Sequence, residues 1–451
     1  MTAKQTPLDL AQWFKQQAVR EVECLVPDVN GFPRGKAMPA SAFAAGQELR
    51  LCRAVAIHTA TGEWADYRFS GEGDPDMRLQ PIPDTLKRVP WAAQPRAMAI
   101  HDCFDLDGKP TPIASRNVLK QVLARYAVHG WSPVVAPELE FYILAPNVDP
   151  NQPFTAPLSR SGRREDGNQG FTLGGLNDLG AFFDEVYAAL ESLGIPADTF
   201  VHELGPSQYE INLLHGDALR LADQTFLFKY ALREIGFKHG LQVVFMSKPL
   251  AGQPGSSMHI HQSVVDVQQR NIFSKEDGGA TELFDAFIAG LQVAIPDLMP
   301  MLCPYVNSYR RFAKHMAAPV NLSWGYDNRS VGIRIPHSGP AARRVENRIP
   351  GCDANPYLAL AASLAAGLHG MEAKLQPTPE AVGTVFEQED TGPSLPRSLD
   401  AALDAMSVSP LAHTLFGSEF VDAFVAAKMI ELDSFTNEVT PWERRFLASL
   451  A

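Results

Sequence analysis

Cysteine is scarce in this chain of 451 residues, and its five cysteines are scattered without a Cys-x-x-Cys spacing. The odd number and wide spacing argue against a disulfide framework, so we expect reduced and mostly buried thiols. The N-terminus lacks the apolar core of a signal peptide. No stretch reaches the roughly 18 uninterrupted apolar residues of a membrane-spanning helix. We therefore expect a cytoplasmic protein that does not bind membranes.

Positive charge is also in short supply. The 39 lysines and arginines face 51 aspartates and glutamates, which gives a formal net charge of −12. Because no lysine- or arginine-rich run offsets this balance, we expect no nucleic-acid-binding surface. The chain contains neither a Gly-x-x-x-x-Gly-Lys loop nor a Gly-x-Gly-x-x-Gly motif. A P-loop or a Rossmann nucleotide site is therefore not expected.

The length predicts at least two domains. Apolar residues make up 45% and charged residues 20% of the chain, which is typical of a soluble globular enzyme. Short strands run to about residue 102, a turn-rich segment follows at 107–112, and Ser115 is predicted to N-cap the next helix. We predict a small α+β domain over residues 1–108 and a larger mixed domain over residues 109–451.

The pattern of apolar residues and turn formers predicts the individual elements. A hairpin turn is expected at 28–31, and a long loop at 146–170. The predicted helices cover residues 8–19, 118–129, 179–193, 217–240, 355–372 and 418–432. The predicted strands cover residues 22–27, 133–144, 208–213 and 242–247.

Three short strand-like segments, far apart in the chain, carry ionisable residues at every second position. Side chains at positions i and i+2 of a strand leave the same face of the sheet, so each segment directs its polar groups one way. Such groups are costly in a folded interior unless they meet partners. The segments carry Glu138 and Glu140, His259 and His261, and Arg344, Glu346 and Arg348.

The carboxylates of Glu138 and Glu140 are flanked by apolar residues typical of a core strand. A solvated edge strand is the alternative for a Glu-x-Glu pair, but buried paired carboxylates repel each other unless a cation lies between them. Glu203 and Glu210 follow on neighbouring segments. Four glutamates with His259 suit Mg²⁺ or Mn²⁺ better than zinc, which favours more nitrogen or sulfur ligands.

Arginine is dense between residues 307 and 348. A basic surface is the alternative, but Arg334 alternates with apolar residues and is expected to point into a site. Guanidinium groups beside a metal cluster suit phosphoryl transfer, because they stabilise charge that spreads over the transferred group. The arginines of this stretch are Arg310, Arg311, Arg329, Arg334, Arg343, Arg344 and Arg348.

Five motifs in order along the chain resemble the glutamine synthetase family, and the resemblance covers nearly the whole chain. They read Pro137-Glu138-Leu139-Glu140-Phe141-Tyr142, Met258-His259-Ile260-His261, Asn307-Ser308-Tyr309-Arg310-Arg311, Asn328-Arg329-Ser330 with Arg334-Ile335-Pro336, and Arg344-Val345-Glu346-Asn347-Arg348 with Asn355-Pro356-Tyr357.

The resemblance implies an α+β fold. A small N-terminal β-grasp-like domain would precede a catalytic domain with an antiparallel, barrel-like sheet flanked by helices. It also implies a homo-oligomer, a dodecamer of two stacked hexameric rings with active sites shared between neighbouring subunits.

The resemblance further assigns expected roles. One divalent metal would be held by Glu140, Glu203 and Glu210, and a second by Glu138, His259 and Glu346. Arg329 and Arg344 would stabilise the phosphate during catalysis, and His261 and Ser263, with Arg344, would bind the nucleotide. The substrate glutamate would be held by Gly255, Arg311, Arg334 and Arg348.

The family chemistry has two steps. ATP phosphorylates the γ-carboxylate of glutamate, and an amine then attacks the acyl phosphate and expels phosphate. The expected cofactor is Mg²⁺ or Mn²⁺, two or more ions per site, with ATP as co-substrate. Metals and arginines would stabilise the first step, and exclusion of water would protect the intermediate.

Two departures bear on the amine. Ala317 stands where glutamine synthetases carry a flap glutamate, and the segment from His58 to Trp64 lacks their Asp-Gly-Ser-Ser sequence. In addition, Pro254-Gly255 replaces the family's Asn-Gly. Loss of two carboxylates removes negative charge from the ammonium site and leaves room for a larger amine. The pattern is similar to γ-glutamylpolyamine and γ-glutamylputrescine synthetases, which implies glutamate–amine ligation in amine breakdown.

The identity of the amine stays open at this point. A polyamine would need a distal carboxylate, for which the candidates are Glu63, Asp66, Asp74 and Asp76. A monoamine would need an apolar pocket, which could be lined by Trp64, Tyr67 and Trp324. The alternatives are an ordinary glutamine synthetase that uses ammonia, which the loss at Ala317 disfavours, and a non-catalytic relative, which the intact metal ligands disfavour.

Overall fold

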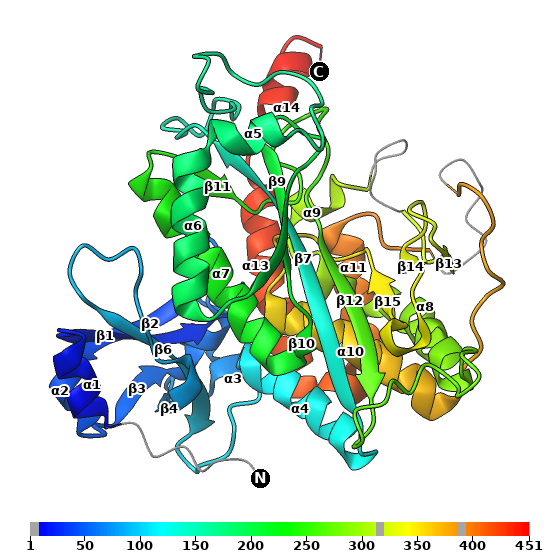
Figure 1. The fold of residues 1–451 in the computed structure, drawn as a ribbon, viewed down its shortest axis with the longest axis horizontal. Coiled ribbons are helices and arrows are strands. Elements are labelled where there is room, and N and C mark those ends of the chain that lie inside the picture. Colours follow the sequence, from blue (N-terminus) through cyan, green and yellow to red (C-terminus); the bar gives the residue numbers. More distant parts are fainter. Residues whose placement is uncertain (1–8, 313–319, 386–393, 451) are drawn as a thin grey trace.

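A computed structural model of the chain describes residues 9–312, 320–385 and 394–450. Figure 1 shows a small sheet domain built by the N-terminal part of the chain, beside a larger body in which long strands are covered by helices. Each part has its own sheet. The predicted α+β fold with a small N-terminal domain is therefore confirmed, and the division at residue 108 stays a prediction.

The small domain contains a six-stranded sheet. Its strands are β1 (Glu21–Pro27), β2 (Pro33–Pro39), β3 (Leu49–Cys52), β4 (Asp76–Pro81), β5 (Lys87–Arg88) and β6 (Ala97–Asp105). They are ordered β2-β1-β6-β4-β3, with β5 also paired to β6. The pair β1–β6 is parallel and the other pairs are antiparallel. The short helices of this part are α1 (Leu10–Gln16), α2 (Ala40–Ala44) and α3 (Tyr67–Ser70).

The predicted hairpin turn joins β1 to β2. The buried carboxylate of Asp28 holds it, because Oδ1 accepts hydrogen bonds from the backbone N–H groups of Asn30 and Phe32, both at 2.9 Å. Its Oδ2 pairs with Arg34 at 2.8 Å. Gly31 has φ +75°, a left-handed conformation that glycine adopts without strain. The turn is therefore fixed by side-chain hydrogen bonds as well as by the ladder.

The larger sheet has nine strands and curves into a nearly closed barrel (Figure 1). They are β7 (Ser132–Leu144), β8 (Ala197–His202), β9 (Gln208–Leu213), β10 (Gly216–Asp217), β11 (Gln242–Val244), β12 (Met258–Val265), β13 (Trp324–Tyr326), β14 (Ile333–Ile335) and β15 (Val345–Asn347). The order is β13-β14-β15-β12-β7-β9-β8, and β10 and β11 also pair with β7. All pairs are antiparallel except β13–β14 at one edge, so the predicted antiparallel, barrel-like sheet is confirmed.

Helices pack around this sheet and form most of the core. The larger part contains α4 (Ser115–Val128), α5 (Leu173–Asp178), α6 (Gly180–Leu193), α7 (Ala218–Lys238), α8 (Glu282–Leu302), α9 (Val306–Tyr309), α10 (Pro356–Ala373), α11 (Leu399–Val408), α12 (Pro410–Phe416), α13 (Ser418–Thr436) and α14 (Pro441–Phe446). The six predicted helices are all present, with ends shifted by a few residues. Residues 146–170 contain no named helix or strand, as predicted.

All five cysteines are free thiols, and four of them are buried.

Ser115 does not cap α4, so this prediction was wrong. Ala114 occupies the N-cap position, and Ser115 is the first helical residue. Its hydroxyl instead donates to the backbone oxygen of Asp28 at 2.9 Å, and Asn355 donates to the same oxygen and to the Ser115 hydroxyl. A contact between elements far apart in sequence thus takes the hydroxyl that local spacing assigned to a cap. The contact ties the β1–β2 turn to the start of α10.

The long helices α8 and α10 approach each other through glycines. A Cβ atom built on Gly290 would lie 2.2 Å from the carbonyl oxygen of Ala366, and one on Gly370 would lie 2.0 Å from that of Ala286. Helix α8 is long and apolar enough to cross a membrane, but 72% of its most apolar window is buried in the protein. Its hydropathy is therefore accounted for by the core that it forms with α10.

We expect Gly290→Ala to destabilise the fold. The added methyl has no room beside Ala366, and overpacking of this kind costs about 1–3 kcal/mol, more than the helix propensity that alanine contributes. The matched control is Gly180→Ala, because a Cβ at Gly180 meets nothing within 4 Å. Thermal unfolding of both variants checks this. Equal melting temperatures would contradict the close approach.

Candidate active site

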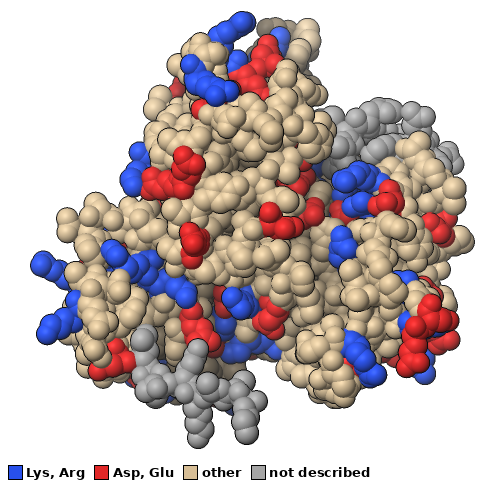
Figure 2. Space-filling view, in the orientation of Figure 1, with Lys and Arg blue, Asp and Glu red and all other residues tan. Residues whose placement is uncertain are grey.

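Strand register brings the three predicted segments onto one face of the large sheet. His259 on β12 lies opposite Glu138 on β7, and His261 lies opposite Glu346 on β15. On the outer strands, Glu210 of β9 lies opposite Glu140, and Arg334 of β14 opposite Glu346. Directly opposed residues share a face. Figure 2 shows acidic side chains, with basic ones beside them, over the region where β7, β9 and β12 run in Figure 1.

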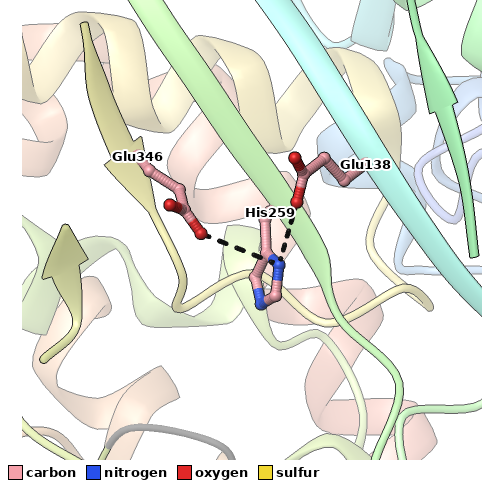
Figure 3. A group of neighbouring side chains, drawn as sticks. All are labelled: Glu138, His259 and Glu346. Carbon is pink, nitrogen blue, oxygen red and sulfur yellow. Dashed lines mark hydrogen bonds and ion pairs between the residues drawn. The ribbon is translucent and has the colours of Figure 1, made fainter. Parts of the chain in front are cut away.

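Glu138, His259 and Glu346 converge from three adjacent strands (Figure 3). The Nδ1 atom of His259 lies 3.4 Å from Oε2 of Glu138 and 3.9 Å from Oε1 of Glu346. One ligand atom from each residue lies within 4.8 Å of the other two. Burial, with the nearby charge of Arg348, lowers the pKa of His259 to about 4. Its imidazole is therefore neutral near pH 7, the state in which it binds a metal.

His261 orients Glu138. The Nε–H of Arg344 donates to Nδ1 of His261 at 3.1 Å, and a guanidinium can only donate. Nδ1 is therefore the acceptor, and a neutral ring carries its proton on Nε2, which lies 2.7 Å from Oε1 of Glu138. Burial alone would raise the pKa of Glu138, but the hydrogen bonds from His259 and His261 more than offset it and hold the pKa below its usual range.

A second group contains Glu140, Glu210 and His259, again with ligand atoms within 4.8 Å of one another. Burial raises the pKa of Glu140, and the charge of Glu203 raises it further. Burial also raises the pKa of Glu210, with added repulsion from Glu140 and Glu138. A hydrogen bond from the backbone N–H of Ser257 to Glu140 at 2.7 Å opposes this increase at Glu140, and one from Asn212 opposes it at Glu210. The carboxylates are thus close enough to repel strongly.

The donor set of these two groups fits hard divalent cations. Carboxylate oxygens with one neutral imidazole suit Mg²⁺ or Mn²⁺, and a cation between the carboxylates would relieve their repulsion. His259 is shared by both groups, which places the two candidate positions side by side. Glu203 follows β8 and influences Glu140 electrostatically, but among the described residues neither group includes it. Its predicted role as a ligand stays a prediction.

Arginines flank the cluster on the β14 and β15 side. Arg334 donates to Oε2 of Glu346 at 2.7 Å and to Asp327 at 2.8 Å, and Arg348 donates to Oε1 of Glu346. Burial would raise the pKa of Glu346, but the charge of Arg348 lowers it to about 2, so the carboxylate is ionised. An ionised carboxylate offers about four lone pairs, so Glu346 can accept from both arginines and still face a cation.

Arg311 is fully buried beside Gly255. It donates to the Ser257 hydroxyl at 2.7 Å and to the backbone oxygen of Ile349. A Cβ atom at Gly255 would lie 2.5 Å from Cγ of Arg311 and 2.8 Å from the carbonyl oxygen of Ser247, so only glycine leaves room for this arginine. All three predicted glutamate-binding arginines, Arg311, Arg334 and Arg348, have an enclosed Nε–H without a hydrogen-bond partner among the described residues.

The remaining predicted site residues are placed less directly. Arg344 contacts His261, as described, and is partly buried. Arg329 is exposed, and its charge lowers the pKa of Glu203 against a larger effect of burial. Ser263 lies two residues after His261 on β12, on the same face of the sheet. The roles predicted for these residues in phosphate and nucleotide binding stay predictions.

The residues that bear on the amine are divided between the two parts of the chain. Ala317 lies outside the described residues. Trp324 is buried in the main core, where its indole N–H donates to the backbone oxygen of Thr378, so it contributes to packing. Trp64 in the small domain is 49% exposed and lies edge-on to His58, with ring centres 4.4 Å apart. Of the two tryptophans predicted to line a pocket, only Trp64 is accessible.

Sequence reasoning missed two contributors. The backbone N–H of Ser257 donates a hydrogen bond to Glu140, and its hydroxyl accepts one from Arg311. No local sequence pattern predicts these contacts. Asn212 lies opposite Glu138 and two residues after Glu210, so it shares the face of the cluster. The alternation along β9 could have revealed Asn212, because the same period of two identified Glu210.

Comparison with known proteins agrees with this arrangement. The glutamine synthetase catalytic domain matches residues 112–447. The glutamate–isopropylamine ligase of a Pseudomonas species is 32% identical over 98% of this chain and 97% of its own. The γ-glutamylputrescine synthetase of Escherichia coli is 34% identical over 94% of this chain and 90% of its own. The glutamine synthetase of Pyrococcus abyssi is 32% identical over 94% and 95%.

The fold also matches a solved structure. GmaS without ligand superposes with a TM-score of 0.84 at 28% sequence identity, over 98% of this chain and 99% of that one. The matched region contains both sheets, so the likeness is not confined to the catalytic part. The match over residues 112–447 and relatives above 30% identity along nearly the full length lead to one conclusion: the chain belongs to the glutamine synthetase family.

Proposed function

We propose that the protein ligates the γ-carboxylate of glutamate to an organic amine, with ATP converted to ADP and phosphate. The observation that carries the proposal is the single sheet face on which a carboxylate–imidazole cluster adjoins arginines that hold Glu346. Cation ligands beside guanidinium groups are what transfer of a phosphoryl group to a carboxylate requires. Relatives named as glutamate–amine ligases support the same reaction type.

In the proposed first step, a γ-carboxylate oxygen of glutamate attacks the γ-phosphorus of ATP and ADP leaves. Arg311, Arg334 and Arg348 would hold the carboxylates of glutamate, because guanidinium groups pair with carboxylates through two parallel hydrogen bonds. Arg329 and Arg344 would stabilise the charge that spreads over the transferred phosphoryl group. Divalent cations, when bound to the carboxylate–imidazole cluster, would neutralise the phosphates and the cluster together.

In the proposed second step, the amine nitrogen attacks the γ-carbonyl carbon of the acyl phosphate. Phosphate leaves and the nitrogen loses a proton, which gives a γ-glutamyl amide. Ammonium enters a site best when carboxylates attract it, and the chain has Ala317 where the family's flap glutamate stands. A neutral flap residue leaves more room for a carbon-bearing amine and attracts ammonium less. This difference favours an organic amine over ammonia.

The wider setting of the reaction is part of the proposal. We place the protein in the cytoplasm, as a dodecamer of two hexameric rings, with the product feeding an amine-degrading reaction sequence. The resemblance to family members supports the assembly. The exposed Trp64 in the small domain also suits a site completed by a neighbouring subunit, since accessible aromatic residues are common where chains meet.

We expect an organic amine to be the preferred nucleophile. Glutamate-dependent phosphate release from ATP is measured with ammonium, putrescine, spermidine, ethanolamine, isopropylamine and phenylethylamine. At least one organic amine should give a kcat/KM about tenfold or more above ammonium, since removal of one charge pairing is worth roughly that factor. Reactions without glutamate give the background. If ammonium were the best substrate, the protein would be an ordinary glutamine synthetase. If no amine supported phosphate release, a non-catalytic relative would be favoured.

Ala317→Glu is expected to shift the preference towards ammonium. A carboxylate there would attract the small cation and narrow the space for carbon-bearing amines. The ratio of kcat/KM for ammonium to that for the best organic amine should rise about tenfold. Ala318→Glu is the matched control, with the same charge one residue along. A similar change in both variants would argue against a specific role for position 317.

Metal binding is expected to stabilise the protein more as pH rises. Without a cation, the raised pKa values of Glu140 and Glu210 mean that the folded state holds protons that the unfolded chain has lost. The contribution of these two carboxyl groups to the free energy of unfolding therefore falls with rising pH between about 5 and about 9. Saturating Mg²⁺ replaces those protons and removes the loss. The melting temperature with Mg²⁺ minus that with chelator should thus grow across this window.

The control for this measurement is Glu210→Gln. It removes one of the repelling carboxylates, so the metal-free variant should be at least as stable as the parent near pH 8 and should gain less from Mg²⁺. A gain from Mg²⁺ that is constant or shrinks with pH in the parent would contradict a cluster of protonated carboxylates.

A further inference from the structure

A cavity of about 690 Å³ lies apart from the carboxylate cluster. Its walls come from the β1–β2 turn, helix α7, strand β11 and the residues around the start of α9. None of the residues to which we assigned metal, phosphate or glutamate binding lines it. The size falls in the range of small-molecule sites, roughly 300–1,000 Å³. Its apolar walls include Phe32, Phe154, Val244, Phe245 and Val306.

Arg233 on α7 supplies a cation to this cavity. Its guanidinium carbon lies 5.6 Å from the ring centre of Phe32 and 5.2 Å from that of Phe245. In the described part of the chain it has no hydrogen bond and no ion pair, and burial lowers its pKa. Buried guanidinium N–H groups without a hydrogen-bond partner are costly, and the cavity has space for such a partner.

The carboxylates of Asp353 and Glu431 also line the cavity, but both already accept hydrogen bonds. Oδ2 of Asp353 accepts from the Ser308 hydroxyl at 2.8 Å, while Oδ1 is fully enclosed and does not face the space. Glu431 accepts from Lys428 at 2.9 Å and from the backbone N–H of Ala60 at 2.7 Å. Neither reaches Arg233 as an ion pair.

Two further cations lie near Arg233, and one of them, Arg310, lines the cavity. Lys229, one helical turn before Arg233, donates to the backbone oxygens of Cys352 and Ala354 and has no carboxylate within ion-pair distance among the described residues. Arg310 lines the cavity, and its guanidinium has no ion pair there either. The cavity therefore presents guanidinium groups without an ion pair, among the described residues, between apolar walls.

We propose that this cavity binds a small organic carboxylate with an apolar or aromatic body. A carboxylate presents two coplanar oxygens that match the N–H groups of a guanidinium. Its apolar body would pack against the rings of Phe32 and Phe245, which already hold Arg233 in place. A phosphate ion suits the space less well, because the apolar walls offer few further donors for its remaining oxygens.

The cavity shares its inner wall with the glutamate-binding region. Asp353 accepts from the N–H of Ser247 at 3.3 Å, and the carbonyl oxygen of Ser247 accepts from the N–H of Ser256 at 2.8 Å, next to Gly255. A bound carboxylate is therefore expected to change the KM for glutamate. This consequence rests on the proposed function, whereas binding of the carboxylate does not.

Binding is tested with the full-length protein, by calorimetry and thermal shift at constant ionic strength. The probes are benzoate and isobutyrate, each compared with its uncharged amide, benzamide and isobutyramide. At least one acid should bind and raise the melting temperature, and its amide should not. This comparison within the parent protein needs no variant.

Arg233→Gln should weaken binding of the acid about tenfold or more, since a hydrogen-bonded charge pair is worth at least that factor. Arg220→Gln is the matched control, an exposed arginine on the same helix, and it should bind as the parent does. Equal binding of acid and amide, absence of binding to the parent, or unchanged binding to Arg233→Gln would overturn the proposal.

Two other outcomes also overturn it. Binding of inorganic phosphate without binding of either acid would assign the cavity to a different anion. A change in oligomer size on gel filtration of Arg233→Gln, with no acid bound by the parent, would assign a carboxylate of a second copy as the occupant. Carboxylate binding together with an inactive protein in the amine assays would leave this inference standing and refute only the proposed function.

Discussion

The concentration of carboxylates on one buried sheet face is the constraint on which the rest of this structure depends. Glu138, Glu140 and Glu210 lie on the paired strands β7 and β9, and their mutual repulsion is largest where water is excluded. Every neighbouring feature can be understood as a response to this repulsion. Imidazoles lie on one side, guanidinium groups lie beyond them, and the space between the carboxylates suits cations.

The ionisable side chains differ from strand to strand across the sheet. From β9 to β14 the groups run from Glu210 and Glu140, whose pKa values are raised, through Glu138 and the neutral imidazole of His259, to the ionised Glu346 held by Arg334 and Arg348. Carboxylates that suit cations therefore lie beside arginines that suit anions. Gly255 contributes to this arrangement, because the absence of a side chain leaves room for the buried Arg311.

The strands and their polar faces could be predicted from the sequence. Alternate residues of a strand point to the same face, so once the other face is apolar the ionisable residues of β7, β12 and β15 must share one side. The sequence also located the long helices, whose patterns are strong. It could not supply the register, which sets His259 opposite Glu138 through contacts between residues over a hundred positions apart. For the same reason Ser115 was assigned to a helix cap and Ser257 was overlooked.

The cavity beside Arg233 could not be predicted from the sequence either. Phe32, Arg233 and Phe245 come from a turn, a helix and the end of a strand, and each is unremarkable in its own segment. Only the tertiary fold brings the cation close to the two rings and leaves its N–H groups without a partner in the part of the chain that the structure describes. A single sequence does not reveal residues that come together only in the tertiary fold.

The central claim is that the γ-carboxylate of glutamate is activated by phosphorylation before the amine attacks. Glutamate labelled with ¹⁸O in its γ-carboxylate tests this most directly, with the released phosphate analysed by mass spectrometry. The account predicts one ¹⁸O atom in inorganic phosphate for each amide formed, with ADP as the nucleotide product. Unlabelled phosphate, or AMP in place of ADP, would contradict it.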